Sequence, residues 1–385
     1  MRSTADAVIV GGGCMGASVA YHLAKRGVSN IVLLEREQML ATGSTGRNAG
    51  GVRHQFSNES NIRLSIESIA LLERFADEVG SPVDFHQDGY LFLLSSPSSV
   101  ATFRENVALQ RRLGVDTEWL GADDAVRLAP GLDASGVAAA TFCARDGIAD
   151  PNGVTMGFAK AAQARGVVVE RDTEATAIVV ESDRVVAVET SRGRIDTPIV
   201  VNAAGPHARR VGRLAGVDVP VDPYRRHIFI AQAGAAGWTV PASHIMVIDF
   251  DTTFYFHREG AGLLFGMGDP REPSTFDTTV RWDFLPEVTE AAVKRVPALE
   301  TASISHAWAG LYEMSPDGNP IIGPVAGVGG LFLINGFSGH GFQHSPAAGR
   351  ILADVIVGVD PGIDLEPFSF ERFRGAAAAG ERYVV

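Results

Sequence analysis

The chain has 385 residues with a formal net charge of −12; 46% of its residues are hydrophobic and 20% are charged. This length predicts two domains or one large interleaved pair. The negative charge disfavours nucleic acid as a partner and provides no basic patch for a membrane surface. No apolar run resembles a membrane span, and the first apolar strand begins so near residue 1 that we expect no targeting segment before it. We therefore predict a cytoplasmic protein.

The first 35 residues follow the order strand, glycine turn, helix, strand, acid. Ala7–Val10 is a short apolar strand, and the glycine-rich run Gly11–Gly16 follows it directly. A helical pattern continues to Arg26, and a second apolar strand over Ile31–Leu34 ends at Glu35. This arrangement is typical of a dinucleotide-binding βαβ unit.

The glycines of this turn have separate roles in such a unit. Gly11 permits the tight turn, Gly13 lets the backbone approach a pyrophosphate, and Gly16 lets helix and strand pack closely. The helix N-terminus presents N–H groups and a positive dipole end to the phosphates. Glu35 is placed to accept hydrogen bonds from an adenosine ribose, and its charge would repel a 2′-phosphate. FAD or NAD is therefore expected rather than NADP.

The rest of the sequence alternates between nucleotide-type and β-rich segments. The patterns predict helices at residues 61–79, 100–113 and 154–165, and strands at 90–94, 167–170, 176–181, 184–190, 199–201, 228–231 and 254–257. Two interruptions by β-rich segments predict an α/β protein with a discontinuous Rossmann-type FAD-binding domain and an inserted α+β substrate domain on a largely antiparallel sheet. The predicted boundaries give 1–82, 144–217 and 313–385 to the first domain, and 83–143 and 218–312 to the second.

A second glycine-rich turn, Gly336–Phe342, lies between a buried strand at 331–334 and a predicted helix at 346–357. Ser345 is the expected N-cap of that helix and Pro346 its first residue. Such a helix start points beyond the carboxyl end of the strand, where ligands bind in open α/β sheets. If the ligand is a flavin, the helix dipole would stabilise negative charge at its N1–C2=O edge on reduction.

Neither a nucleophilic serine nor a metal site is predicted in this turn. Ser338 is not part of a G-x-S-x-G motif, and His340 and His344 lack the intervening glutamate of a zinc motif. The two cysteines of the chain, Cys14 and Cys143, are too few for an iron–sulfur cluster. We therefore expect no metal.

Five segments, spread in one order over almost the whole chain, form a recognisable pattern: Gly11–Gly16, Gly43–Gly46, Asn202–Gly205, Asn319–Pro324 and Gly336–Phe342. Together they resemble the D-amino-acid-oxidase-like family of FAD-dependent oxidoreductases, near its sarcosine oxidase and dimethylglycine dehydrogenase branch. The mitochondrial FAD-dependent protein that assists complex I assembly is also similar, in Val52–Ser57, Ala307–Gly310 and Pro367–Phe370.

The resemblance implies oxidation of a C–N bond, usually in an N-substituted amino acid. A hydride leaves the carbon for flavin N5, and the imine hydrolyses to an amine and a carbonyl compound. Arg53 matches an arginine that binds the substrate carboxylate, which suits the bidentate fork of a guanidinium. His54 follows it as in the family, and Tyr255 and Tyr312 match substrate-facing tyrosines.

His340 and Gln343 complete the candidate catalytic residues. No single base stands out, so His54, His257 and Tyr312 are all candidates for deprotonating a substrate ammonium. Hydride transfer needs no protein base if the amine binds in its neutral form.

The resemblance also implies which residues contact FAD. They lie in the first glycine turn, after the second strand, in the loop near residue 45, at the ends of later strands and in the C-terminal turn. They are Gly11, Gly13, Met15, Gly16, Glu35, Arg36, Ser44, Thr45, Arg47, Asn48, Ala49, Gly50, Ala175, Ala204, Gly205, Gly310, Gly339, His340, Gly341, Phe342 and Gln343.

Several positions differ from the family pattern. Gln343 stands where sarcosine oxidases have a lysine as a second cation for the carboxylate, so one cation remains and a different or larger substrate is expected. Residues 262–266 lack the lysine that activates oxygen in those oxidases, which favours another electron acceptor. Gly310 and Arg47 stand where relatives attach the flavin, so we expect non-covalent FAD. The chain has three lysines, all on predicted surface helices: Lys25, Lys160 and Lys294.

Three functions stay open at this point. The first is oxidation of a secondary or tertiary amino acid, with a small carboxylate-bearing amine as substrate. The second is oxidation of a 2-hydroxy acid, which needs the same carboxylate contact. The third is a flavin-containing subunit or assembly factor that needs a partner chain. An electron-acceptor subunit or a homo-oligomer is a possible partner.

Overall fold

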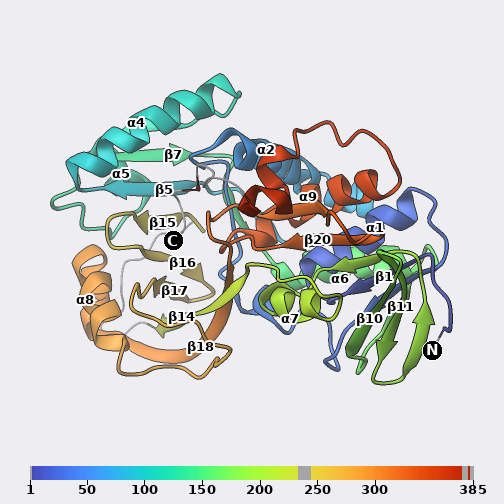
Figure 1. Ribbon diagram of the computed structural model, residues 1–385. Helices are drawn as coiled ribbons and strands as arrows, with labels where there is room; N and C mark the ends of the chain where they lie inside the picture. The colour runs from blue at the N-terminus through green and yellow to red at the C-terminus, as the bar shows by residue number, and fades with distance from the viewer. Residues whose placement is uncertain (1, 233–243, 375–379, 382–385) are drawn as a thin grey trace.

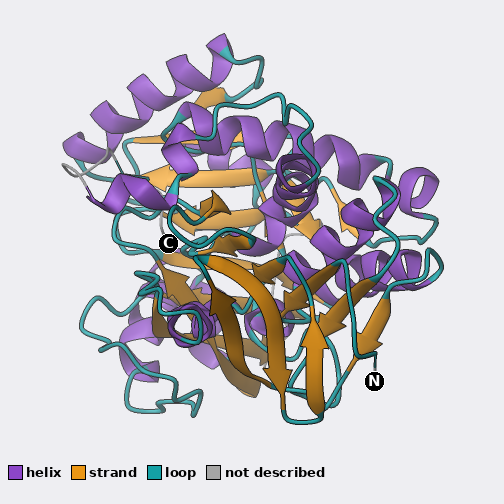
Figure 2. Cartoon of the chain, turned by 45° about the vertical axis from the view of Figure 1, so that its right-hand side comes forward, coloured by secondary structure: helices purple, strands orange, loops and turns teal. Residues whose placement is uncertain are grey.

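The computed structural model describes residues 2–232, 244–374 and 380–381. Two large sheets organise these residues, a six-stranded one and an eight-stranded one, with two three-stranded sheets beside them. Figure 1 shows the eight-stranded sheet with α4 and α8 on one side of the molecule, and α1, α6 and α9 around the other sheet. In the rotated view of Figure 2, the strands run through the centre and most helices lie outside them.

The six-stranded sheet contains the opening βαβ unit. Its order is β19-β20-β13-β1-β2-β9, and all neighbours are parallel except the edge strand β19. Both faces are covered, so β1 and β2 are wholly apolar rather than alternating. The strands are β1 (Ala7–Val10), β2 (Ile31–Leu34), β9 (Val168–Glu170), β13 (Val200–Asn202), β19 (Ile321–Pro324) and β20 (Leu331–Asn335).

Alternate residues of these strands enter different cores. Ala7 and Ile9 pack with the helices α1 (Cys14–Lys25), α2 (Glu59–Glu73), α6 (Pro151–Gln163) and α9 (Gly341–Ile356). Val8 and Val10 pack instead with α7 (Ala208–Arg213) and the antiparallel sheet β10-β11-β12. Those three strands are Ala175–Glu181, Arg184–Thr190 and Gly193–Asp196. Successive side chains of a strand point to opposite faces, which explains the division.

The eight-stranded sheet has the order β18-β14-β17-β16-β15-β5-β7-β6 and is antiparallel except between β15 and β5. Its strands are β5 (Tyr90–Leu94), β6 (Glu118–Leu120), β7 (Ala139–Cys143), β14 (Asp222–Gln232), β15 (Met246–Asp249), β16 (Phe254–Glu259), β17 (Gly262–Met267) and β18 (Ser303–Met314). Three helices accompany it: α4 (Pro97–Arg112), α5 (Ala122–Leu128) and α8 (Leu285–Arg295). The predicted fold class, with its largely antiparallel second sheet, is confirmed.

Short elements complete the described chain. β3 (Gly51–Val52), β8 (Gly147–Ala149) and β4 (Phe85–His86) form the second small sheet. Short helical segments are α3 (Phe75–Val79), η1 (Ser44–Arg47), η2 (Gly205–His207), η3 (Pro297–Thr301), η4 (Glu366–Phe368) and η5 (Phe370–Arg374). The domain boundaries near residues 82, 143, 217 and 312 stay a prediction, and parts of 218–312 and 313–385 lie outside the described residues.

The helices predicted at 100–113 and 154–165 begin three residues earlier in the structure, at Pro97 and Pro151, and two other predicted helices differ more. The pattern over 61–79 forms two helices that meet at Arg74, and the first begins at Glu59 because the Asn58 side chain caps it by accepting from the Asn61 N–H at 2.9 Å. The helix predicted from Pro346 begins five residues earlier, at Gly341. Ser345 is therefore not an N-cap. Its Oγ donates to the Phe342 carbonyl at 2.8 Å, the bond that Pro346 has no N–H to make.

Candidate active site

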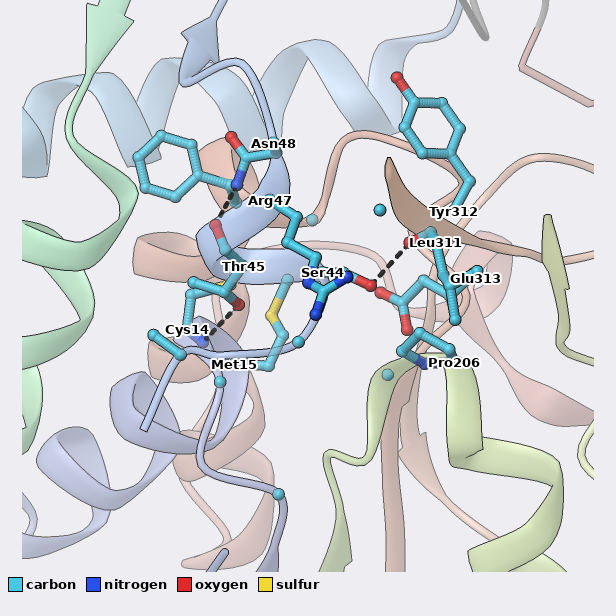
Figure 3. A pocket seen from close by; sticks show the side chains of 18 of the residues that line it. Cys14, Met15, Ser44, Thr45, Arg47, Asn48, Pro206, Leu311, Tyr312 and Glu313 are labelled. Carbon is cyan, nitrogen blue, oxygen red and sulfur yellow. Dashed lines mark hydrogen bonds between the residues drawn. The ribbon is translucent and has the colours of Figure 1, made fainter. Parts of the chain in front are cut away.

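A single cavity of about 600 Å³ connects the two large sheets. It extends from the turn between β1 and α1, along the loop 41–49, to strands β14, β16 and β18 and the turn before α9. Figure 3 shows part of its lining, with Cys14 and Met15 facing Pro206, Leu311, Tyr312 and Glu313 across the opening. The cavity thus has a dinucleotide end at the parallel sheet and a second end at the antiparallel sheet.

The dinucleotide end is built by backbone and glycines. Gly11 has φ +118°, and a Cβ there would lie 2.3 Å from the Ala203 carbonyl oxygen. A Cβ on Gly16 would lie 1.9 Å from the Gly11 oxygen, so helix α1 packs against the turn only if this residue is glycine. Gly13 lines the cavity as the N-cap of α1 and has no side chain to fill the approach. This cradle fits a pyrophosphate.

Glu35 lies at the same end and holds the turn as well as facing the cavity. One carboxylate oxygen accepts the Gly12 N–H at 2.8 Å, and the other accepts the Glu37 N–H at 2.9 Å. The carboxylate keeps further lone pairs for ribose hydroxyls. Arg36, His207 and Arg210 line the same end, together with Ala175, Ala204 and Gly205.

The loop that holds η1 is fastened to β18. Ser44 Oγ donates to the Leu311 carbonyl at 2.6 Å, and Arg47 Nη1 donates to the Ala309 carbonyl at 3.0 Å. A Cβ on Gly310 would lie 3.0 Å from the Arg47 Cβ. Arg47 and Gly310, the two positions at which the sequence resemblance implies flavin attachment in other members, therefore lie side by side in the cavity lining, and neither carries a thiol or an imidazole.

The turn before α9 combines three residues with positive φ: Gly336 at 70°, Ser338 at 51° and Gly339 at 93°. Ser338 tolerates this conformation because its buried hydroxyl accepts the Ser315 N–H at 3.1 Å. The turn ends at His340, the N-cap residue of α9, so the helix N-terminus opens directly into the cavity lined by residues 339–343. The helix therefore begins at the cavity lining itself, five residues earlier than the sequence predicts.

Three tyrosines form the second end of the cavity, Tyr90 buried and Tyr255 and Tyr312 half-buried, and each lies against a glycine. A Cβ built on Gly51 would lie 2.1 Å from the Tyr90 hydroxyl. A Cβ on Gly266 would lie 2.5 Å from the Tyr255 hydroxyl, and a Cβ on Gly339 would lie 2.5 Å from the Tyr312 ring. Burial raises the pKa of all three phenols above the usual value. They are neutral hydrogen-bond donors at physiological pH.

Arg53 enters the cavity beside this tyrosine cluster. Its guanidinium carbon lies 4.4 Å from the Phe56 ring centroid and 5.4 Å from that of Phe92. Its backbone N–H donates to Gln343 Oε1 at 2.7 Å, so the amide of Gln343 is partly occupied in holding this segment. Burial on two aromatic rings fixes the direction of the guanidinium.

Three of the predicted site residues do not line the cavity: Gly16, Gly50 and His54. His54 is buried behind it, with Nδ1 2.6 Å from Asp146 Oδ1, and the same oxygen accepts the His54 N–H at 2.7 Å. The candidate base His257 also lies outside the lining, and its ring nitrogens contact the carbonyl oxygens of Arg258 at 2.7 Å and Ala49 at 3.1 Å. The histidines at 54 and 257 are therefore placed to hold the backbone.

His54, Cys143 and Asp146 have ligand atoms within 4.8 Å of one another, which is a possible metal geometry. Hydrogen bonds account for the Asp146 carboxylate, because Oδ2 also accepts from Gln55 at 3.1 Å. Burial raises the pKa of the Cys143 thiol, which disfavours the thiolate that a metal needs. The absence of a metal stays a prediction.

Among the lining residues that the sequence analysis missed are Tyr90, Arg226 and Glu313. Arg226 is one of 30 arginines, and only strand pairing places it here. Burial raises the pKa of the Glu313 carboxyl to about 7, and its Oε2 has no hydrogen-bond partner among the described residues. The carboxyl points into the cavity beside Ser44 and Pro206 (Figure 3).

The lysines lie where the sequence predicts. Lys25, Lys160 and Lys294 are exposed on α1, α6 and α8, and none lines the cavity. Among residues 2–232, 244–374 and 380–381, we find no helix with the length and apolar character to span a membrane.

Comparison with known proteins gives consistent results. The model of a family described as FAD dependent oxidoreductase matches residues 6–355. FAD-dependent oxidoreductase domain-containing protein 1 of Xenopus laevis is 32% identical, over 99% of this chain and 85% of that protein. Mitochondrial dimethylglycine dehydrogenase of Rattus norvegicus is 30% identical over 94% of this chain, which spans only 44% of that enzyme. The crystal structure of L-proline dehydrogenase from P. horikoshii has a TM-score of 0.89 and 34% identity, and covers 97% of this chain and 99% of that one.

Proposed function

Because the chain belongs to the FAD-dependent oxidoreductase family, we propose that it oxidises the C–N bond of an N-substituted amino acid. The observation that carries this proposal is the position of Arg53, which lines the same cavity as the dinucleotide cradle. A guanidinium binds a carboxylate through two parallel hydrogen bonds and so fixes the orientation of the rest of the molecule. The similarity to dimethylglycine dehydrogenase and L-proline dehydrogenase supports a tertiary or secondary amine as the group that reacts.

The side chains of the second end perform three tasks in this proposal. Arg53 holds the carboxylate, and its aromatic supports Phe56 and Phe92 keep it from turning away. The neutral phenols of Tyr255 and Tyr312 donate hydrogen bonds and exclude water from the reacting carbon. FAD, when bound, accepts the hydride. The N-terminus of α9 then stabilises negative charge that arrives with it.

The lining of the cavity favours an amine that loses its proton before or during binding, rather than one that is deprotonated by a histidine in the site. His340 is the only histidine among the described residues that lines the second end, and its ring packs edge-on against Phe56 at 5.0 Å. The hydride step needs no protein base if the amine binds in its neutral form. After the hydride has left, water adds to the imine and releases an amine and a carbonyl compound.

We also propose an electron acceptor other than O₂. No lysine lines the described part of the cavity, and the three lysines are exposed on outer helices. In the oxidases that the sequence resembles, a lysine at the position of residues 262–266 activates oxygen, and this chain has no lysine there. We therefore propose that the protein acts as a dehydrogenase rather than as an oxidase.

The direct test is anaerobic mixing of the FAD-loaded protein with N-methyl amino acids, proline derivatives and 2-hydroxy acids. We expect N-substituted amino acids to bleach the flavin absorbance and to release an amine, with slow recovery in air and fast recovery with an artificial acceptor. Bleaching by 2-hydroxy acids alone would replace the amine reaction by alcohol oxidation. No bleaching by any of these compounds would favour a flavin-containing subunit or assembly factor, and a second chain that co-purifies would support that function.

A further inference from the structure

Arg226 is a second cation in the cavity, and it differs from its neighbour Arg225. Both lie on β14, where successive side chains point to opposite faces. Arg225 is buried on the outer face and donates to Glu272 Oε1 at 2.8 and 3.0 Å and to Asp277 Oδ2 at 2.7 Å. Arg226 faces the cavity.

No carboxylate lies within 4.0 Å of the Arg226 guanidinium among the described residues. Its Nη1 donates to the backbone carbonyl of Arg225 at 2.9 Å, and its Nε is buried without a hydrogen-bond partner. Arg226 as a whole is half-buried, so a positive charge with no carboxylate beside it lines the cavity. A ligand that fills the cavity is the available source of an anion to pair with it.

Arg226 and Arg53 reach the cavity from different elements, β14 and the loop after β3. The Arg226 guanidinium carbon lies 5.2 Å from the Tyr312 ring centroid. The Arg53 guanidinium carbon lies instead 4.4 Å from the Phe56 ring centroid and 5.4 Å from that of Phe92, so the two guanidiniums pack on different rings. A ligand long enough to contact both residues would meet one guanidinium at each end.

We propose that Arg226 binds a second carboxylate, and that the substrate is a dicarboxylic secondary amine whose nitrogen links two carboxylate-bearing carbons. This inference rests on the proposed function, in which Arg53 holds the first carboxylate. A monocarboxylic amine leaves Arg226 unpaired, whereas a dicarboxylic one pairs both guanidiniums and extends across the tyrosine cluster. Loss of a hydride to FAD and of the N–H proton to solvent gives an imine. Addition of water and cleavage of the C–N bond then release an amino acid and a 2-oxo acid.

The test uses two thioether ligands that are not amines and therefore bind without reacting. Thiodiacetate has two carboxylates. The carboxylate (ethylthio)acetate, called ethylthioacetate below, has the same chain length but only one carboxylate. The FAD-loaded protein is titrated with each, and the dissociation constant is read from the change in flavin absorbance. We compare the wild type with Arg226→Met, Arg226→Lys and the matched control Arg258→Met, which removes an arginine from the same sheet outside the cavity.

The wild type is expected to bind thiodiacetate about thirtyfold more tightly than ethylthioacetate, because a charge-assisted pair inside a cavity is worth roughly that much. Arg226→Met should remove this preference and leave ethylthioacetate binding within about twofold. Arg226→Lys should keep part of the preference, and Arg258→Met all of it.

Equal binding of the two ligands to the wild type, or no binding of either, overturns the proposal without recourse to any variant. An Arg226→Met variant that weakens both ligands equally also overturns it, because Arg226 would then be the primary carboxylate site. Failure of the proposed function has a different signature. In that case thiodiacetate is still preferred, but neither N-(carboxymethyl)alanine nor N-ethylalanine bleaches the flavin under anaerobic conditions.

Discussion

The two ends of the cavity are built in different ways. The phosphate cradle of the dinucleotide end comes from one continuous stretch, the turn from β1 into α1, and it is made by backbone and glycines. The second end takes single side chains from β5, β14, β16 and β18 and from the loop after β3. A site made by the backbone tolerates no added atoms, whereas a site made of side chains can change one group at a time. We therefore expect substitutions at the two ends to fail in different ways.

The largest expected effect is at the dinucleotide end, for Gly11→Ala. The new methyl would lie 2.3 Å from the Ala203 oxygen at a backbone with φ +118°, so β1 or its neighbour must shift. We expect FAD affinity to fall by roughly a thousandfold, or ~4 kcal/mol. Gly27→Ala is the matched control, because it has φ +91° with nothing within 4 Å. FAD binding followed by fluorescence quenching checks this, and equal losses in both variants would show that strain alone is responsible.

At the second end, Arg53→Met should leave FAD bound but remove the carboxylate contact. Loss of one partner of a buried charge pair costs about 2–5 kcal/mol, so kcat/KM should fall by roughly a hundredfold or more. Arg63→Met, on the exposed side of α2, is the control and should change nothing. Steady-state kinetics with an amine that bleaches the flavin measures the effect. A variant that keeps its kcat/KM would show that Arg53 is not the carboxylate site.

Glu313 lies between the two ends and should make the stability of the flavin-free protein depend on pH. Burial raises its pKa from 4.5 to about 7, although the backbone N–H groups of Phe337 and Gly336 oppose the shift. The folded state holds this proton more tightly than the unfolded chain. The free energy of unfolding should therefore fall by roughly 3 kcal/mol as the pH rises from about 4.5 to about 7, and stay low above that.

Glu313→Gln should remove this loss and make the flavin-free protein more stable than the wild type at about pH 8, with little difference near pH 4.5. Urea unfolding at both pH values measures the difference. Glu290→Gln, on the exposed side of α8, is the control. Parallel pH profiles of the wild type and Glu313→Gln would contradict the prediction.

The smallest expected effect is for Gly339→Ala. A methyl there would lie 2.5 Å from the Tyr312 ring, which can turn away, so we expect kcat/KM to fall by about tenfold with FAD retained. Gly358→Ala has a similar positive φ of 74° with open space and should lose stability but not activity. If Gly339→Ala releases FAD as Gly11→Ala does, the turn before α9 belongs functionally to the dinucleotide end.

The sequence predicted correctly those elements whose residues all lie close together along the chain. The βαβ unit was readable because glycine spacing, apolar strands and Glu35 all lie within 35 residues. The predicted start of α9 was wrong because proline normally lies in the first turn of a helix. Here Pro346 lies inside the helix, and the Ser345 hydroxyl donates the hydrogen bond to the Phe342 carbonyl that Pro346 has no N–H to make. His54 was expected at the substrate, but Asp146, 92 residues later in the chain, draws its ring away from the cavity.

The sequence by itself determined the fold class, the dinucleotide cradle and the scarcity of lysine, because each depends on composition or on neighbours along the chain. Only the tertiary structure decided which of the 30 arginines face the cavity, since strand pairing over long separations aims Arg226 inward and Arg225 outward. Burial likewise exists only after folding, and it sets the pKa of Glu313 and of the three tyrosines. The dinucleotide end could thus be predicted from the order of residues along the chain, whereas the second end is determined by how distant residues pack together.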